Sequence, residues 1–197
     1  SGNSNVPNKK LKKLMKETKE TGIKYLFSSS KMIKENYKED LGAIIDYYHQ
    51  KGYRDALISG DSLYMNEDGL LMLDISIHEG KQYFFGDISW IGNKKYDSET
   101  LSTLIGIKNG EIFDSALLEE RLNMSRNGDD ISALYMDDGY LFFQVKPVQV
   151  SLIEGNYIDL EMQINEGKQA TINQITITGN TKTNDHVIMR EVRSLPG

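Results

Sequence analysis

The chain contains no cysteine, only three prolines and a single tryptophan among its 197 residues. The absence of cysteine excludes disulfide bonds and thiolate metal sites, and it leaves the redox compartment undetermined. No apolar run approaches the roughly 20 residues that a membrane-spanning helix needs. The N-terminal residues lack the basic-then-apolar layout of a signal peptide, so we expect any export signal to lie outside this sequence.

Basic residues are in the minority, with 23 Lys and Arg against 29 Asp and Glu and a formal net charge of −6. This balance argues against a general nucleic-acid binder, which normally presents a basic face to phosphates. The one strongly basic run, between Lys9 and Lys19, could touch lipid headgroups or an acidic partner. Its interleaved leucines favour a solvated face of an amphipathic helix instead.

Motifs of catalysis and cofactor binding are also missing. The three histidines, His49, His78 and His186, share no metal-ligand spacing. There is no Gly-x-Ser-x-Gly elbow, and the loop from Gly106 to Gly110 lacks the Lys-Ser/Thr pair that would complete a phosphate-binding loop. We therefore predict that the chain is not an enzyme and that it binds no metal and no cofactor.

What the sequence does contain is an internal repeat of 87 residues, carried by three landmarks. Gly52-Tyr53 recurs as Gly139-Tyr140, Glu79-Gly80-Lys81-Gln82 recurs as Glu166-Gly167-Lys168-Gln169, and Gly92-Asn93 recurs as Gly179-Asn180. Three landmarks with one spacing indicate tandem copies of a single unit. Gly2-Asn3 is a candidate for one more copy of the Gly-Asn pair.

One copy of the repeat has the element order β-α-α-β-β. A strand at 88–91 ends in the Gly-Asn turn, Asp97 or Ser98 caps a short helix, and Asp114 caps a second helical stretch. That stretch should break near Asn127-Gly128, where Asp129 or Asp130 can cap again. Strands at 142–152 and 157–165 follow, the second alternating between apolar and polar residues. In the first copy we expect a helix from about Ser30 to Gln50 and a turn at 66–69.

Three strands with one apolar face need a covering layer of helices. We therefore predict an α+β fold of tandem domains, each a three-stranded mixed sheet covered by two helices.

This order of elements resembles POTRA domains, the periplasmic repeat modules of outer-membrane protein assembly factors. The resemblance rests on the Gly-Asn strand end, the Leu-Tyr-x-x-x-Gly-Tyr close of the second helix at 134–140, and the Glu-Gly after the last strand. The first copy, at 47–53, departs from that helix-closing pattern only in its first residue, Tyr47. On this resemblance residues 1–80 are a domain lacking most of its first strand, 81–167 are a complete domain, and 168–197 are the beginning of a third.

The resemblance also implies a place and a set of partners. The chain would lie at the periplasmic face of the outer membrane of a Gram-negative bacterium, in a parent protein anchored by a C-terminal β-barrel beyond this sequence. Its partners would be unfolded outer-membrane β-barrel proteins, assembly-complex lipoproteins and periplasmic chaperones.

Strand addition offers a physical route to such clients, because an exposed sheet edge carries unpaired backbone groups that an extended peptide can use. The strand after Gly139-Tyr140 is the predicted edge, since Pro147 lies within it and proline is largely confined to edge strands and bulges. Pro147 could equally serve to protect the edge from unwanted pairing. Of the adjacent rings Phe142 and Phe143, one should face the core and one should face outward. The predicted peptide-binding residues are Phe142, Phe143, Gln144, Val145, Lys146, Val148 and Val150, with Ala56, Ile58 and Leu63 in the first copy.

Short linkers join the copies, and we predict hinges at Gly80 and Lys81 and at Gly167 and Lys168 within a semi-rigid rod.

Three other functions stay open at this point. The array could serve a barrel that secretes one dedicated substrate, or it could be a spacer that recruits partners without touching clients. A nucleic-acid module of the KH type is disfavoured by the acidic charge and by the lack of a basic glycine loop.

Overall fold

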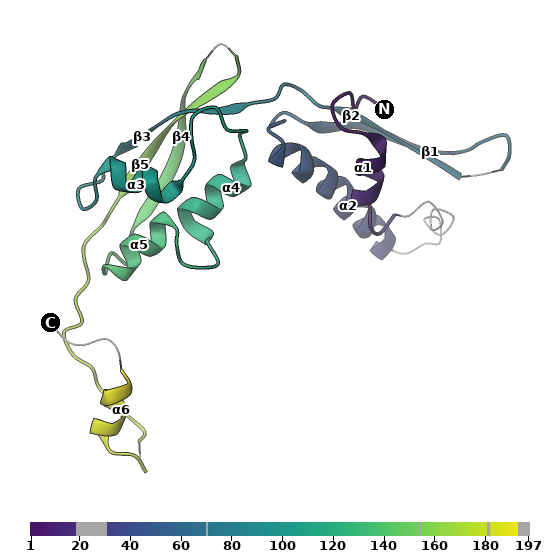
Figure 1. The fold of residues 1–197 in the computed structure, drawn as a ribbon. Coiled ribbons are helices and arrows are strands. Elements are labelled where there is room, and N and C mark those ends of the chain that lie inside the picture. Colours follow the sequence, from purple (N-terminus) through teal and green to yellow (C-terminus); the bar gives the residue numbers. More distant parts are fainter. Residues whose placement is uncertain (19–30, 70, 154, 181, 193–197) are drawn as a thin grey trace.

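The computed structural model describes residues 1–18, 31–69, 71–153, 155–180 and 182–192 (Figure 1). Two α+β units follow one another along the chain, and an extended segment with one short helix comes after them. Within the described residues, no helix is both long and apolar enough to cross a bilayer.

The first unit is a β-hairpin with two helices packed beside it. Its elements are α1 (Asn8–Leu14), α2 (Lys31–Gln50), β1 (Leu57–Met65) and β2 (Leu71–His78). The two strands pair antiparallel, with a bulge between Ile58 and Gly60. Their helices bury a small cluster that consists of Val6, Leu11, Ile44, Tyr48, Tyr53, Ala56 and Ile77. The helix predicted from about Ser30 is α2, although Ser30 itself lies outside the described residues.

Ser1 lies beside β2, where a first strand of this unit would run. Its amino group donates to the carbonyl of Ile75 at 2.7 Å, and its carbonyl accepts the N–H of Ile77 at 2.9 Å. Among the described residues, the sheet of the first unit therefore has two strands, and Ser1 pairs with β2 beside them.

The second unit contains all the elements of the predicted β-α-α-β-β order. In chain order they are β3 (Phe84–Ile91), α3 (Ser98–Ile105), α4 (Ser115–Glu119), the π-helical turn η2 (Glu120–Met124), α5 (Ile131–Asp137), β4 (Gln144–Ile153) and β5 (Tyr157–Asn165). The predicted second helix is thus divided into three pieces. The division falls at the predicted Asn127-Gly128 break and, additionally, at the π-helical turn, for which the sequence pattern carries no signal.

Aspartates begin the helices of the second unit. The side chain of Asp97 accepts the N–H of Thr100, that of Asp114 accepts two N–H groups at the start of α4, and that of Asp130 accepts the N–H of Ala133. Each carboxylate satisfies donors that have no partner within the helix, which fixes where the helix starts. The predicted caps are confirmed. Asp97 rather than Ser98, and Asp130 rather than Asp129, is the capping residue.

The sheet of the second unit has the strand order β3-β5-β4. β3 pairs parallel with β5, and β4 pairs antiparallel with it, so the sheet is mixed as predicted. The strand predicted at 157–165 is confirmed as β5, and its alternate residues Ile158, Leu160, Met162 and Ile164 are all buried. β5 therefore supplies the centre of the apolar face.

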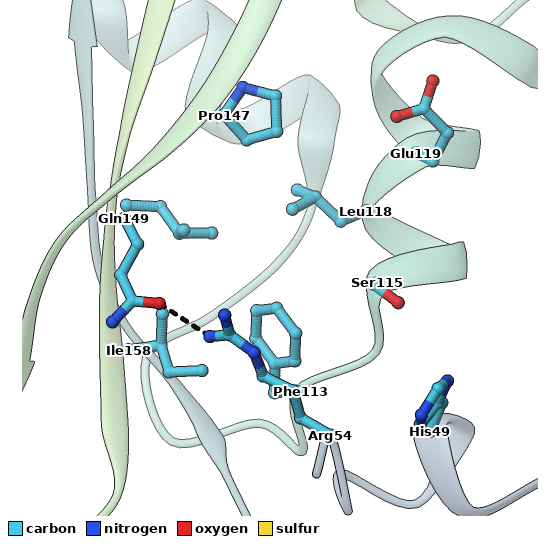
Figure 2. A pocket seen from close by; sticks show the side chains of 10 residues that line it. His49, Arg54, Phe113, Ser115, Leu118, Glu119, Pro147, Gln149 and Ile158 are labelled. Carbon is cyan, nitrogen blue, oxygen red and sulfur yellow. Dashed lines mark hydrogen bonds between the residues drawn. The ribbon is translucent and has the colours of Figure 1, made fainter. Parts of the chain in front are cut away.

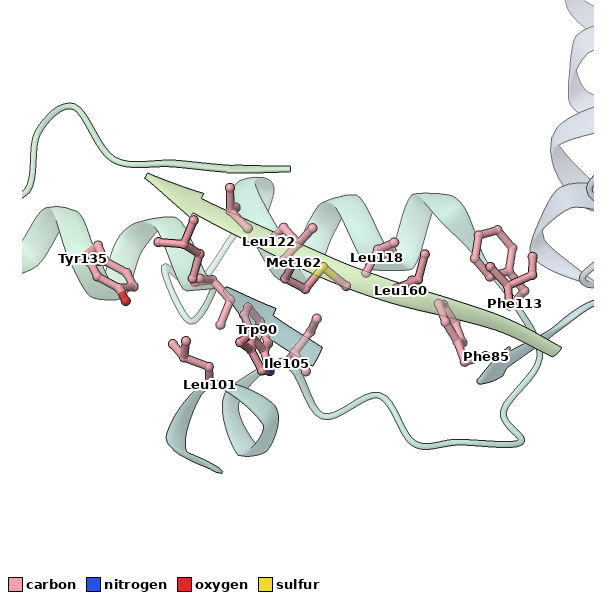
Figure 3. Close-up of a cluster of buried hydrophobic side chains, with 14 of the residues drawn as sticks. Phe85, Trp90, Leu101, Ile105, Phe113, Leu118, Leu122, Tyr135, Leu160 and Met162 are labelled. Atoms are coloured by element: carbon pink, nitrogen blue, oxygen red, sulfur yellow. The ribbon is translucent and has the colours of Figure 1, made fainter. Parts of the chain in front are cut away.

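Helices α3, α4 and α5 cover that face and close one continuous core, seen in Figure 3 as side chains of the strands meeting those of the helices. Ten of its members are Phe85, Trp90, Leu101, Ile105, Phe113, Leu118, Leu122, Ile131, Tyr135 and Phe143. Fully burying one large apolar side chain contributes about 1.5–3 kcal/mol. The second unit therefore carries the greater part of the hydrophobic stabilisation among the described residues.

The segment after the second unit differs from its prediction. Residues 168–180 run without strand pairing in the described part of the chain, although the opening strand of a third repeat was expected there. A strand needs a hydrogen-bonded neighbour, and β3 obtains its neighbour from β5 at the far end of the same repeat. Residues 168–180 have no such neighbour within the described residues. Among the described residues after the second unit, the one regular element is the short helix α6 (Asp185–Glu191), whose hydrogen bonds are local.

Candidate peptide-binding edges and domain junctions

β4 is an edge of the three-stranded sheet, since β5 is its only strand neighbour within the described residues. It begins at Gln144 rather than at the predicted Phe142, because Phe143 still belongs to a turn in which its N–H donates to the carbonyl of Tyr140. Pro147 lies within β4 opposite Met162, as an edge position permits. A bulge between Gln149 and Ser151 leaves Val150 outside the register with β5.

The residues predicted to bind peptides divide into two groups in the structure. Phe143 and Val145 are buried in the core and are not accessible to a client. Phe142, which is 74% exposed, precedes the strand, so it is the outward ring of the predicted pair. Of the predicted residues within β4, Gln144, Lys146, Val148 and Val150 are accessible.

The first unit offers β1 as a second candidate edge, and β2 is its only strand neighbour among the described residues. Ala56 is buried and precedes β1, while Ile58 and Leu63 are half-buried within it. Asp61 in the same strand accepts the hydroxyl of Tyr37. β1 therefore combines a candidate edge with an acidic group, whereas the accessible residues of β4 carry no acidic group.

A pocket of about 350 Å³ lies beside β4, between the two units (Figure 2). From the second unit it is lined by Pro147 and Gln149 of β4 and by residues of α4 and β5. From the first unit His49 and Arg54 reach it. Alternate side chains of a strand added to β4 would point to the same face as Pro147 and Gln149, so this pocket is placed to receive one of them.

Arg54 joins the two units across this pocket. Its Nη1 donates to Oε1 of Gln149 at 2.6 Å, and its guanidinium lies 6.0 Å from the ring centroid of Phe113 (Figure 2). Tyr83, at the start of the second unit, donates its hydroxyl to Asp55 at 2.6 Å, which raises the pKa of Tyr83 chiefly through that bond and further through burial. The carbonyl of Tyr83 accepts the N–H of Phe113. Arg54 and Asp55, in one loop of the first unit, therefore both contact the second unit.

A tyrosine and a glutamate form the same network in both units. Tyr48 donates its hydroxyl to Glu79 at 2.9 Å, and Tyr135 donates to Glu166 at 3.1 Å. Burial and this bond to a carboxylate raise the pKa of both tyrosines. Each tyrosine also packs edge-on against the tyrosine of the following Gly-Tyr pair, Tyr53 or Tyr140, with centroids 5.7 and 5.8 Å apart.

The two glutamates also hold the Gly-Asn turns. Glu79 accepts the backbone N–H groups of Ser4 and Asn5, and Glu166 accepts those of Lys94 and Lys95. Burial alone would raise the pKa of Glu79, but the bonds from Tyr48, Asn5 and Ser4 outweigh it and hold that pKa below its ordinary value.

The asparagine of each Gly-Asn pair makes one repeated contact. Asn3, Asn93 and Asn180 donate from Nδ2 to the carbonyl three residues ahead, at 2.8, 2.9 and 2.9 Å. Gly2-Asn3 is therefore a genuine copy of the landmark.

The linkers are attached to the preceding unit in the same way at both junctions. Nε2 of Gln82 donates to the carbonyl of Lys51 at 2.9 Å, and Nε2 of Gln169 donates to that of Asp138 at 2.8 Å. The N–H of the next residue donates to the glycine of the Gly-Tyr pair, Gly52 or Gly139, at 2.8 Å in each case.

Those glycines cannot be replaced without strain. A Cβ on Gly52 would come within 2.7 Å of the carbonyl oxygen of Tyr83, and one on Gly139 within 2.8 Å of that of Ala170; both glycines have a positive φ. The predicted hinge residues Gly80, Lys81, Gly167 and Lys168 lie directly before the attached glutamines. Bending of the chain at these four residues remains a prediction.

Sequence reasoning found the members of these networks as repeated landmarks but did not connect them with one another. The signal was present in their common spacing, because Tyr48 with Glu79 and Tyr135 with Glu166 are separated by the same number of residues. Nothing in the sequence, however, indicates that the two groups meet.

In the part of the chain that the structure describes, no three His, Asp or Glu side chains gather as a metal site would require.

The fold and the junctions define a class of protein: a tandem array of small α+β repeats, each attached to the next through a short glycine-containing linker. The POTRA family, described as a surface antigen variable number repeat, matches residues 83–167. Residues 83–167 therefore form a POTRA domain, and the resemblance seen in the sequence is confirmed.

Relatives extend the similarity over nearly the whole chain. The chain is 28% identical over 197 residues to the outer membrane protein assembly factor BamA of Neisseria meningitidis serogroup B, which covers 98% of this chain and 24% of that protein. It is 26% identical over 192 residues to BamA of Neorickettsia risticii, covering 97% of this chain and 25% of that protein. The chain thus spans about a quarter of the length of these relatives.

A solved structure supports the fold. The crystal structure of POTRA domains 3–5 of Haemophilus influenzae BamA superposes with a TM-score of 0.61 at 22% identity, covering 100% of this chain and 75% of that one. This agreement supports the α+β fold of the chain.

Proposed function

We propose that this chain is a periplasmic scaffold segment of an outer-membrane protein assembly factor, and that β4 receives extended segments of unfolded outer-membrane proteins as an added strand. The observation that carries the proposal is the free edge of β4 beside a pocket open to side chains. The similarity to proteins named outer membrane protein assembly factor supports the wider role.

Backbone pairing suits such a role because it depends little on the amino-acid sequence of the bound segment. An added strand gains its affinity from main-chain hydrogen bonds, and side-chain pockets contribute selectivity at alternate positions. On β4 the exposed Val148 and Val150 offer apolar contacts, while the pocket at Pro147 and Gln149 can take one side chain on the other face. A client with alternating apolar residues would match both features.

β4 is the stronger of the two candidate edges. β1 presents Asp61, and the described part of its unit has two strands and a smaller buried cluster, so an added strand there would rest on a smaller core. Assembly lipoproteins and periplasmic chaperones are the further partners of this proposal.

The test is an amide NMR titration of the chain with peptides of about ten residues copied from outer-membrane barrel strands. We expect shifts concentrated on residues 144–151. A peptide of the same sequence with N-methyl groups on every residue keeps its side chains but has no N–H donor at either edge, so it should not bind as an added strand. Equal binding of the methylated peptides would exclude strand addition.

Two proline variants provide a matched comparison of the edges. Val150 in β4 and Ser59 in β1 are the bulge residues, both outside the paired register, so a proline there removes an N–H without removing a registered pair. Val150→Pro should weaken the peptide at least about fivefold, the effect of losing roughly 1 kcal/mol of hydrogen bonding. Ser59→Pro should leave binding unchanged. If no peptide causes shifts at millimolar concentration, the chain does not bind clients directly and the spacer function is favoured.

A further inference from the structure

The two ends of the pocket beside β4 differ in charge. Its floor is formed by buried apolar side chains of the second unit, those of Phe113, Leu118, Ile158 and Leu160. His49 and Arg54 of the first unit line the end near Phe113, whereas Glu119, the last residue of α4, lines the other end (Figure 2). A ligand in this pocket therefore meets an apolar floor with a cationic group at one end and an anionic group at the other.

The guanidinium of Arg54 has more donors than the protein uses. A guanidinium carries five N–H donors. In the described part of the chain, Arg54 makes one hydrogen bond, from Nη1 to Oε1 of the uncharged Gln149, and no carboxylate forms an ion pair with it. Its contact with the ring of Phe113 holds the guanidinium beside the pocket floor. Because the remaining donors form a planar fork, the group matches a carboxylate.

Gln149 defines where an added strand would meet this guanidinium. It lies opposite Leu160 in the register between β4 and β5, so its side chain is on the helix-covered face of the sheet. Residues directly opposite one another on neighbouring strands have Cβ atoms about 4.5–5.5 Å apart. A residue of an added strand opposite Gln149 would therefore place its side chain beside Arg54. Two residues away, the side chain opposite Pro147 would point toward the Glu119 end.

We propose that Arg54 is a specificity-determining residue of the β4 site, and that it selects an extended segment with a carboxylate side chain opposite Gln149. The inference rests on the proposed function, because it requires a strand added to β4. The apolar floor contacts the methylene groups of a glutamate, and the fork of Arg54 binds its carboxylate. Glu119 disfavours a second carboxylate opposite Pro147, so the pocket selects the register as well as the residue type. The site is on this basis composite, with one repeat supplying the edge and the other the charge.

Peptide titrations test this selection. The probe is a barrel-strand peptide of about ten uncharged residues, in which a single glutamate is moved through the positions of one face. The glutamate peptide that binds most tightly is then compared with the peptide that carries lysine at the same position. The wild-type chain should bind the glutamate peptide at least about threefold more tightly, the effect of a partly exposed ion pair. Its binding should also shift the side-chain Nε–H signal of Arg54.

Charge reversal assigns the preference to Arg54. In Arg54→Gln the preference should disappear, and in Arg54→Glu the lysine peptide should bind more tightly than the glutamate peptide. Because Arg54 is exposed, both variants should keep the amide spectrum away from the pocket. Arg126→Glu is the matched control, since Arg126 is also exposed and is not among the described residues that line the pocket. It changes the net charge equally and should keep the preference for glutamate.

The possible failures are distinguishable. An unchanged preference in Arg54→Glu would overturn the inference and leave strand addition at β4 standing. A preference that Arg126→Glu also reverses would overturn it too, because net charge rather than the pocket would then be responsible. Failure of every peptide to bind would overturn the proposed function together with this inference.

Discussion

The first and second units enclose the same tyrosine–glutamate network within cores of unequal size. Tyr48 with Glu79 and Tyr135 with Glu166 have nearly equal geometry, although one unit has two strands and the other has three. The network is thus independent of the completeness of the sheet. It joins the end of the second helix, the end of the last strand and the Gly-Asn turn, which are close in space in both units.

The two units also differ in the side chains that they present toward the next part of the chain. The first uses the polar pair Arg54 and Asp55, and the second presents Leu141 and Phe142 at the same positions. The comparison shows that equivalent positions of the repeat carry polar side chains in the first unit and exposed apolar side chains in the second.

The largest expected effect comes from shortening one core side chain in each unit. Ile44 and Ile131 are counterparts, and both are buried. Ile131→Ala should destabilise the second unit by about 3–5 kcal/mol, because its closely packed three-stranded core leaves a cavity. Ile44→Ala should cost the first unit less, about 2 kcal/mol, because a smaller core can relax around the deletion.

Urea unfolding measures the two effects separately. Trp90 is the only tryptophan and lies in the core of the second unit, so its fluorescence follows that unit. Amide signals of β1 and β2 follow the first. Equal losses of unfolding free energy in the two units would show that core size does not determine the effect of the substitution.

A smaller effect is expected from removing the hydroxyl of each network tyrosine, and here the order of the units should reverse. Glu79 is buried and Glu166 is only half-buried, so Glu79 depends more on its protein donors. A hydrogen bond to a charged group contributes about 1.5–3 kcal/mol, and leaving a buried acceptor short of donors adds to the loss. Tyr48→Phe should therefore cost about 2–3 kcal/mol and Tyr135→Phe about 1–2 kcal/mol.

The same unfolding experiments apply to these variants. Tyr53→Phe is the control in the first unit, because it changes a neighbouring hydroxyl while keeping the edge-on ring contact with Tyr48. A greater loss for Tyr135→Phe than for Tyr48→Phe would contradict the role assigned to burial.

The smallest effect is a pH dependence of the first unit. The folded-state pKa of Glu79 lies below its ordinary value of 4.5, so the folded state binds fewer protons than the unfolded state in that range. The stabilisation is fully present above 4.5 and is lost as the pH falls from there through the lowered folded-state pKa. Stability of the first unit should therefore decline on acidification through this window.

Glu79→Gln should flatten that decline, since glutamine keeps an acceptor but does not titrate. The measurement is the urea midpoint of the first-unit amide signals as a function of pH, in the wild type and in the variant. An equal decline in both would show that other carboxylates cause it.

Much of the fold follows from local patterns in the sequence. The alternation in 157–165 predicts β5 with its bounds, and the aspartates before apolar runs predict the caps at Asp97, Asp114 and Asp130. Both depend on interactions within a few residues, so they can be read from the sequence. The π-helical turn η2 and the late start of β4 could not, because they depend on the packing of distant elements.

The candidate site was only partly visible in the sequence. Pro147 pointed to the edge strand, but neither the pocket nor the burial of Val145 could be foreseen, because both depend on where α4 and the first unit lie against β4. The unpaired segment at 168–180 shows the same limit. Its residues have the pattern of a strand, yet a strand exists only where a neighbour supplies hydrogen bonds.

By itself, the sequence determined the repeat, its period, the order of elements and the POTRA resemblance, since each rests on residue type and spacing along the chain. Tertiary structure alone decided that Tyr135 meets Glu166, that Arg54 reaches Gln149, and that Met136, Leu141 and Phe142 stand uncovered. These contacts join residues far apart in sequence. Their geometry depends on how whole elements pack, which local propensity does not encode.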